Sequence, residues 1–94
     1  MIEPIDNSQQ RQVLARTEHF IVTAEEALER GFDRIPVLFD LSGTTAGMFR
    51  AHGRQRELRY NPWIFSKYWD VNFQETVPHE VAHYIVHEVY GFQK

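Results

Sequence analysis

Two histidines and a glutamate near the end of this 94-residue sequence are of the residue types that form zinc sites. They lie in the segment His79-Glu80-Val81-Ala82-His83. In a helix, His79 and His83 would stand about 40° apart around the axis and about one turn along it, so both imidazoles could reach one metal ion. Glu80 would lie about 60° beyond His83, where it could contact a metal-bound water without ligating the metal. This layout is typical of metal-assisted hydrolysis.

The residues around this segment are typical of an amphipathic helix. One side of the helix would be apolar and the opposite side would carry the histidines and Glu80, so one face could pack into a core while the other presents metal ligands. The apolar side comprises Val81, Ala82, Ile85, Val86 and Val89. The alternative is a helix with a polar, histidine-rich face that is simply exposed to solvent.

We predict that this helix covers residues 73–90, with Asn72 as its N-cap, Glu75 completing a capping box and Gly91 at its end. Pro78 conflicts with this prediction, because a proline inside a helix removes a backbone hydrogen bond at a cost of about 3 kcal/mol. The helix therefore either kinks just before the histidines or begins near Val77.

The preceding sequence predicts a small α+β domain. A helix is expected over residues 8–30, capped by Asn7 or Ser8, because apolar residues recur there at spacings of three and four. Three strand-like runs follow, over residues 35–41, 45–50 and 55–60. Short connections, including a turn at His52-Gly53, favour an antiparallel sheet. A short aromatic helix is expected from Pro62, with Trp63 and Trp69 more suited to a core than to a binding cleft.

The overall composition narrows the function classes. The formal charge of −3 argues against nucleic-acid binding by bulk charge, and the absence of cysteine excludes disulfides and thiol chemistry. The N-terminus has neither a basic start nor an apolar run, and no apolar run reaches transmembrane length. We therefore expect a cytoplasmic protein with no membrane partner.

Three segments, in this order along the chain, resemble motifs of the SprT-like zinc metallopeptidases, a family that includes bacterial SprT proteins and the Spartan protease domain. They are Gly43-Thr44-Thr45-Ala46-Gly47, then Leu58-Arg59-Tyr60-Asn61-Pro62, then Val77-Pro78-His79-Glu80-Val81-Ala82-His83, in which a proline directly precedes the first histidine. The resemblance covers nearly the whole chain. It implies a minimal zincin-like domain: an N-terminal helix, a three-stranded antiparallel sheet, a short aromatic helix and a C-terminal active-site helix.

The resemblance also implies a reaction. His79 and His83 would ligate Zn²⁺, and Glu80 would act as the general base that activates a zinc-bound water to cleave a peptide bond. In zincins an edge strand usually receives the substrate as an added strand. We expect residues 54–60 to be that strand, with Arg56, Leu58 and Tyr60 binding a protein or peptide substrate.

The sequence departs from the family at the third zinc ligand, which in the family is a histidine of a downstream His-Gly motif. His87 follows His79 by eight residues, about 12 Å along a helix, which is too far for one zinc ion to bind both. His19 and His52 cannot be placed from the sequence. Three explanations remain: residues 1–94 are a single SprT-like domain that is incomplete at its C-terminal end, which we favour; a partner chain completes the site; or the domain is degenerate and inactive.

Two non-catalytic functions therefore compete with hydrolysis. The first is a protein- or DNA-binding module built on an inactive or incomplete protease fold. The second is a nucleic-acid-binding module in which Arg50, Arg54 and Arg56, around the His52-Gly53 turn, contact phosphates while Trp63 and Trp69 nearby contact bases. The acidic net charge instead favours a solvated hairpin face.

Overall fold

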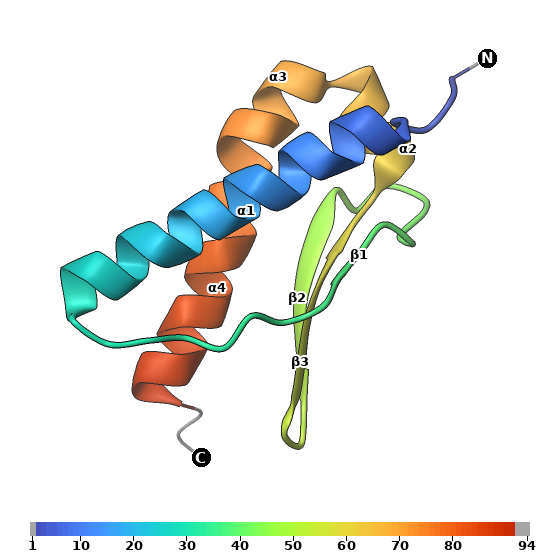
Figure 1. Cartoon of the computed structure of the whole chain (residues 1–94). Helices are drawn as coiled ribbons and strands as arrows, with labels where there is room; N and C mark the ends of the chain where they lie inside the picture. Colours follow the sequence, from blue (N-terminus) through green and yellow to red (C-terminus); the bar gives the residue numbers. More distant parts are fainter. Residues whose placement is uncertain (1, 92–94) are drawn as a thin grey trace.

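The computed structural model describes residues 2–91 and shows helices packed on a three-stranded sheet (Figure 1). This agrees with the expected α+β class. In chain order the elements are α1 (Asn7–Leu28), β1 (Val37–Leu38), β2 (Gly47–His52), β3 (Gln55–Tyr60), α2 (Pro62–Lys67), α3 (Trp69–Val71), the π-helix η1 (Asn72–Thr76) and α4 (Val77–Tyr90). None of the helices in this described part of the chain is long and apolar enough to cross a membrane.

The long helix α1 begins one residue earlier than expected. Asp6, rather than Asn7 or Ser8, is the N-cap: its carboxylate accepts from the Gln9 backbone N–H, and the Gln9 side chain accepts from the Asp6 N–H. This reciprocal pair satisfies two backbone donors that a helix start otherwise leaves unpaired. Val13, Thr17 and Ile21 form the buried stripe of α1, at the spacing of four that the sequence predicted.

The prediction of an entirely antiparallel sheet is wrong. The strand order is β1-β3-β2, and β1 runs parallel to β3, with Val37 opposite Leu58. Only β2 and β3 form an antiparallel hairpin, closed by a tight turn in which Gly53 has a φ of 60°. After β1 the chain first forms β2, which is the far edge strand, and then turns back to place β3 between β1 and β2.

This order makes β3 the central strand, and its core-facing side chains are completely buried. Leu58 and Tyr60 are both 0% exposed, and the Tyr60 hydroxyl lies 3.3 Å from the Thr17 hydroxyl of α1. Burial raises the pKa of Tyr60, so this phenol remains protonated and acts as a structural group.

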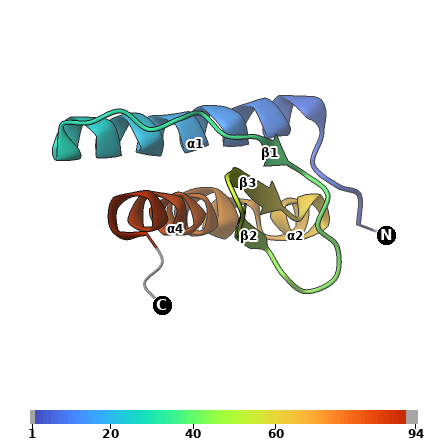
Figure 2. The same ribbon diagram turned by 90° about the horizontal axis from the view of Figure 1, so that it is seen from below.

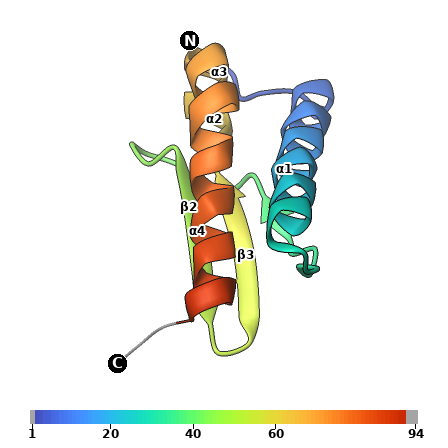
Figure 3. The ribbon, with the colours of Figure 1, turned by 90° about the vertical axis from the view of Figure 1, so that its left-hand side faces the viewer.

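Helix α4 lies against β2, and α1 lies against α4 (Figures 2 and 3). The inner face of α4 contributes Val77, Val81 and Tyr84 to the core, and the Tyr84 hydroxyl donates to the Asp33 carbonyl at 2.7 Å. The outer face is left to solvent. The helix thus has one core face and one exposed face, but the predicted membership of these faces is partly wrong. Glu80 was expected beside the histidines on the polar face and is only 7% exposed, whereas Ala82 and Val86, expected in the core, are exposed, because α4 packs on β2 and α1 through the side that carries Val81 and Tyr84.

The π-helix explains how the chain accommodates Pro78. A regular helix would need the Pro78 nitrogen to donate to the residue 74 carbonyl, which proline cannot do. Instead α4 begins at Val77, which was one of the two predicted alternatives. The Val77 N–H donates to the Asn72 carbonyl, five residues earlier, across the wider turn of the π-helix. Pro78 therefore lies in the first turn of α4, where a missing N–H costs little.

The prediction that Asn72 caps this helix is wrong. Its side chain is buried, its amide donates to the carbonyls of Ile64 and Tyr68, and its side-chain oxygen accepts from the Thr76 hydroxyl at 2.6 Å. Asn72 thus ties the π-helix to the two short helices before it.

Candidate functional site

His79 and His83 project from the outer face of α4 toward solvent. Their Nε2 atoms lie 3.0 Å apart, and the two rings are nearly perpendicular, at 85°. Two nitrogens bound to one tetrahedral zinc ion at about 2.0–2.1 Å would be separated by about 3.3 Å. The pair therefore fits two positions of such an ion after a shift of a few tenths of an ångström.

Glu80 lies on the inner side of the same turn and is only 7% exposed. Burial raises the pKa of its carboxyl group, whereas the nearby His83 and His79, and a backbone hydrogen bond from Phe49, act in the opposite direction. Because burial is the largest of these effects, this carboxyl group accepts a proton more readily than an exposed glutamate does.

Gly47, at the start of β2, makes the burial of Glu80 possible. A β-carbon at position 47 would lie 3.0 Å from the Glu80 Cγ, 3.0 Å from the Thr76 Cγ2 and 3.3 Å from a Tyr60 ring carbon. Because this space holds no side chain, α4 and the π-helix can approach the strand closely. The sequence marked Gly47 through a family motif and did not reveal this steric role.

The exposed strand edge beside Glu80 belongs to β2, not to β3. The Asn61 N–H bonds to the Ala46 carbonyl at 2.9 Å, so the hydrogen-bonded pairs with β3 involve the even-numbered residues of β2. The backbone groups of Gly47, Phe49 and Ala51 accordingly point to the free edge. The prediction that residues 54–60 form the substrate-receiving edge is wrong, because that strand is central.

The three substrate-binding residues expected on that strand are also engaged elsewhere. Leu58 and Tyr60 are buried in the core. The Arg56 guanidinium bonds to the Glu88 carboxylate at 2.9 Å and to the Gly53 carbonyl at 2.7 Å, which joins the hairpin to the C-terminal half of α4. None of the three lies beside the histidine pair.

A hollow of about 340 Å³ lies next to His79 and Glu80, between the start of β2 and the π-helix. Its lining also includes Ala46, Val71 and Glu75. A group bound here would contact the Glu80 turn and the free edge of β2 together.

Residues 2–91 contain no cluster of three His, Cys, Asp or Glu side chains arranged to hold a metal ion. The His87 ring packs 5.5 Å from that of Phe49, on the side of α4 that faces β2. His19 lies on α1 against Phe20, and His52 ends β2 at the hairpin turn. In the part of the chain that the structure describes, the two histidines predicted as ligands therefore lie together, and no third His, Cys, Asp or Glu side chain completes a metal-binding cluster with them.

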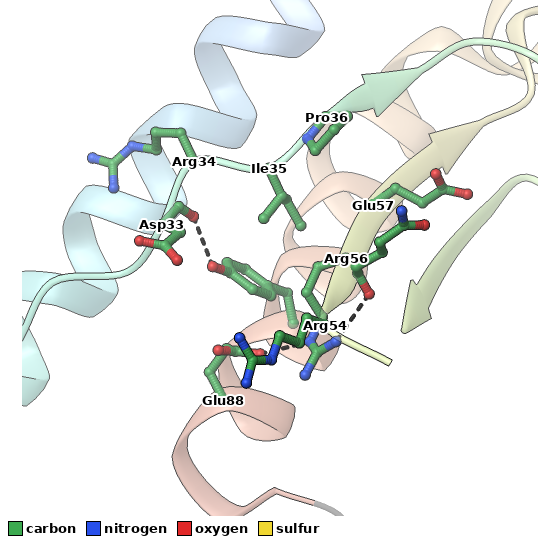
Figure 4. Close-up of a pocket in the computed structure, with 10 residues that line it drawn as sticks. Asp33, Arg34, Ile35, Pro36, Arg54, Arg56, Glu57 and Glu88 are labelled. Carbon is green, nitrogen blue, oxygen red and sulfur yellow. Dashed lines mark hydrogen bonds and ion pairs between the residues drawn. The ribbon is translucent and has the colours of Figure 1, made fainter. Parts of the chain in front are cut away.

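Arg54 and Arg56, two of the three arginines considered for nucleic-acid binding, line a different hollow, of about 650 Å³, between the hairpin, the 33–36 segment and α4 (Figure 4). Acidic side chains share this lining: Arg56 pairs with Glu88, and Arg50 lies 3.9 Å from Glu57 at the neighbouring surface. Trp63 is in α2 and Trp69 in α3, at the opposite end of the sheet from the hairpin turn (Figure 1). The predicted combination of arginines with nearby tryptophans does not form.

Comparison with known proteins was consistent with the motifs. The SprT-like family model matches residues 17–94. The chain is 38% identical over 80 residues to Protein SprT of Pseudomonas syringae, covering 85% of this chain and 48% of that protein. It is 35% identical over 85 residues to Protein SprT of Shewanella oneidensis, covering 90% of this chain and 53% of that protein.

The chain therefore spans about half the length of the curated relatives it matches. No solved structure matches it significantly. The family match extends over α4 and over β2, the two elements that carry His79, Glu80 and Gly47. On this extent of similarity, the chain belongs to the SprT-like family.

Proposed function

We propose that this chain is a zinc-dependent peptidase domain, in which His79 and His83 hold the metal and Glu80 is the general base. The observation that carries the proposal is the pairing of two solvent-facing Nε2 atoms, 3.0 Å apart, with a largely buried carboxyl group on the same helical turn. A bound zinc ion would supply a water of lowered pKa and would polarise the substrate carbonyl.

The protein's own groups would then have separate tasks. Glu80 would accept the proton of the attacking water and later donate it to the leaving amine, a role that the raised pKa of its carboxyl group favours. The backbone N–H of Phe49 would keep this carboxyl group oriented. Gly47 would leave the room that Glu80 needs beside the strand.

We propose further that the substrate is a protein or peptide bound in extended form along β2. The outward N–H and C=O groups of Gly47 and Ala51, together with the C=O of Phe49, would pair with its backbone, as in other cases of strand addition, while the Phe49 N–H stays with Glu80. This edge runs past Glu80, whereas β3 is enclosed on both sides. A peptide on β2 would therefore present its carbonyl groups near the histidine pair.

An alternative is a non-catalytic protein- or DNA-binding module on the same fold. It is favoured by the absence, within residues 2–91, of a third metal ligand next to His79 and His83. Two imidazoles alone would hold zinc more weakly than the three protein ligands of typical catalytic sites.

The test measures zinc content and casein cleavage in the unmodified chain, in Glu80→Gln and in His83→Ala. We expect Glu80→Gln to retain zinc and to lose at least about 100-fold in hydrolysis, because only the base is removed. His83→Ala should lose both. Glu26→Gln, an exposed residue on α1, is the control for loss of one negative charge. Zinc binding without hydrolysis in the unmodified chain would favour the binding module.

A further inference from the structure

The hollow beside the histidine pair has the lining of a side-chain subsite. Its apolar walls include Ala46, Gly47 and Val71, and its ionisable groups are Glu75, His79 and Glu80. Within residues 2–91, no lysine or arginine contributes to this lining. The hollow would therefore suit a Lys or Arg side chain, whose apolar stem would contact the apolar walls while its positive end lies near the acidic groups.

Glu75 is the acidic group of this lining that remains exposed to solvent. Many other glutamates of the described chain already have a cation: Arg34 pairs with Glu18 and Glu25, and Arg56 pairs with Glu88. Within residues 2–91, Glu75 has no ion pair or side-chain hydrogen bond. Its carboxylate is thus available to a group that comes from outside the chain.

The position of Glu75 relates it directly to the reacting groups. It precedes His79 by four residues and lies on the π-helix, on the wall of the hollow opposite the start of β2. Gly47 offers no side chain that would block a residue entering from a peptide on β2. The hollow is therefore open to that peptide on one side and bounded by Glu75 on the other.

We infer that this hollow selects a Lys or Arg side chain of the substrate close to the bond that is cut, and that Glu75 is the residue that recognises its positive charge. The inference rests on the proposed binding of a peptide along β2. It adds a substrate class to that proposal: segments rich in basic residues.

The expected effect is moderate, because Glu75 is exposed and its ion pairs are screened by water. An exposed pair that also forms a hydrogen bond should favour a basic over a neutral side chain by about threefold to tenfold. Added salt should reduce this preference, since it screens exposed charges but not apolar contact.

The probes are capped hexa-alanine peptides that carry Lys, norleucine or Glu at one of the four central positions. Norleucine has nearly the length and shape of Lys without its charge. In the unmodified chain, one position should show a kcat/KM for Lys about threefold to tenfold above that for norleucine. Glu75→Gln should abolish this ratio, and Glu75→Lys should reverse it in favour of Glu. Glu26→Gln is the matched control and should leave the ratio intact.

A binding measurement separates this inference from the proposed catalysis. In the Glu80→Gln variant, the NMR chemical shifts of the Gly47 and Thr76 amides should change more on adding the Lys peptide than on adding the norleucine peptide. The double variant Glu75→Gln/Glu80→Gln should show no such difference. If this binding difference were found and the unmodified chain hydrolysed none of the peptides, the subsite would be supported and the peptidase rejected. Equal binding and cleavage of Lys and norleucine peptides at every position, or a Lys preference that survives Glu75→Gln, would overturn the subsite and leave the peptidase standing.

Discussion

Gly47 and Glu80 are in such close approach that a β-carbon on the first would lie 3.0 Å from the Cγ of the second. One residue is at the start of β2 and the other is in the first turn of α4, 33 positions later in the sequence. The contact sets how deeply the carboxyl group sits and how near the histidine pair lies to the strand edge.

Gly47→Ala should displace Glu80 and destabilise the fold. The added methyl group must move Glu80, Thr76 or the Tyr60 ring, and overpacking of this kind costs about 1–3 kcal/mol. Urea unfolding monitored by circular dichroism would measure the loss. Casein hydrolysis, the proposed activity, should fall along with it.

Gly31→Ala is the control for this substitution. A β-carbon there would have only an ordinary contact, 3.7 Å from the Glu25 carboxylate, and Gly31 does not have a positive φ. The free energy of unfolding of the Gly31→Ala variant should differ from that of the unmodified chain by less than about 1 kcal/mol. Equal losses for the two variants would show that the close approach at Gly47 is not what matters.

Asn72→Ala should cost about 2–3 kcal/mol of unfolding free energy. The substitution leaves the Ile64 and Tyr68 carbonyls and the Thr76 hydroxyl without the buried amide that now bonds to them. Because these bonds anchor the π-helix, amide hydrogen exchange should quicken first in residues 72–77. Gln74→Ala changes an exposed residue of the same π-helix and should have little effect.

Glu80→Gln should stabilise the metal-free chain at neutral pH. Burial raises the folded-state pKa of this carboxyl group above its value in the unfolded chain. Between the two pKa values the folded state binds more protons, so stability falls as pH rises through that window, and the ionised group opposes folding above it. Glutamine removes this cost, and the advantage should disappear as the pH falls below the unfolded pKa of about 4.3.

This comparison needs EDTA throughout, since zinc bound to the folded state would stabilise the glutamate form separately. Thermal unfolding from pH 3 to pH 8 would provide the two curves. A difference between variants that is constant with pH would show that the effect does not come from ionisation of Glu80.

Glu25→Gln should have the opposite pH dependence. Hydrogen bonds from Arg34 and from the Phe32 N–H lower the pKa of Glu25 to about 2. The carboxylate therefore contributes stability above its unfolded pKa, and this contribution is lost as the pH falls toward 2. The variant should be less stable than the unmodified chain at pH 7 and nearly equal to it at pH 2. Glu26→Gln, at the adjacent exposed position, is the control for loss of one negative charge from α1.

Residue spacing alone determined the local features of this protein. The four-residue interval between His79 and His83 places both side chains on the same face of an α-helix, because the helix turns once in 3.6 residues. The periodic stripe of α1 and the turn at Gly53 follow equally from local rules. Pro78 correctly indicated that a regular helix could not continue through the residues before the histidines.

Only the tertiary structure decided which strand flanks the site. Strand order depends on which surfaces bury the most apolar area across distant parts of the chain, and nothing local to residues 55–60 shows that β1 will pair with them in parallel. That pairing encloses Leu58 and Tyr60 and leaves β2 at the edge. The burial of Glu80 beneath Gly47 likewise arises when α4 packs on β2, because no spacing rule relates two residues that far apart in sequence.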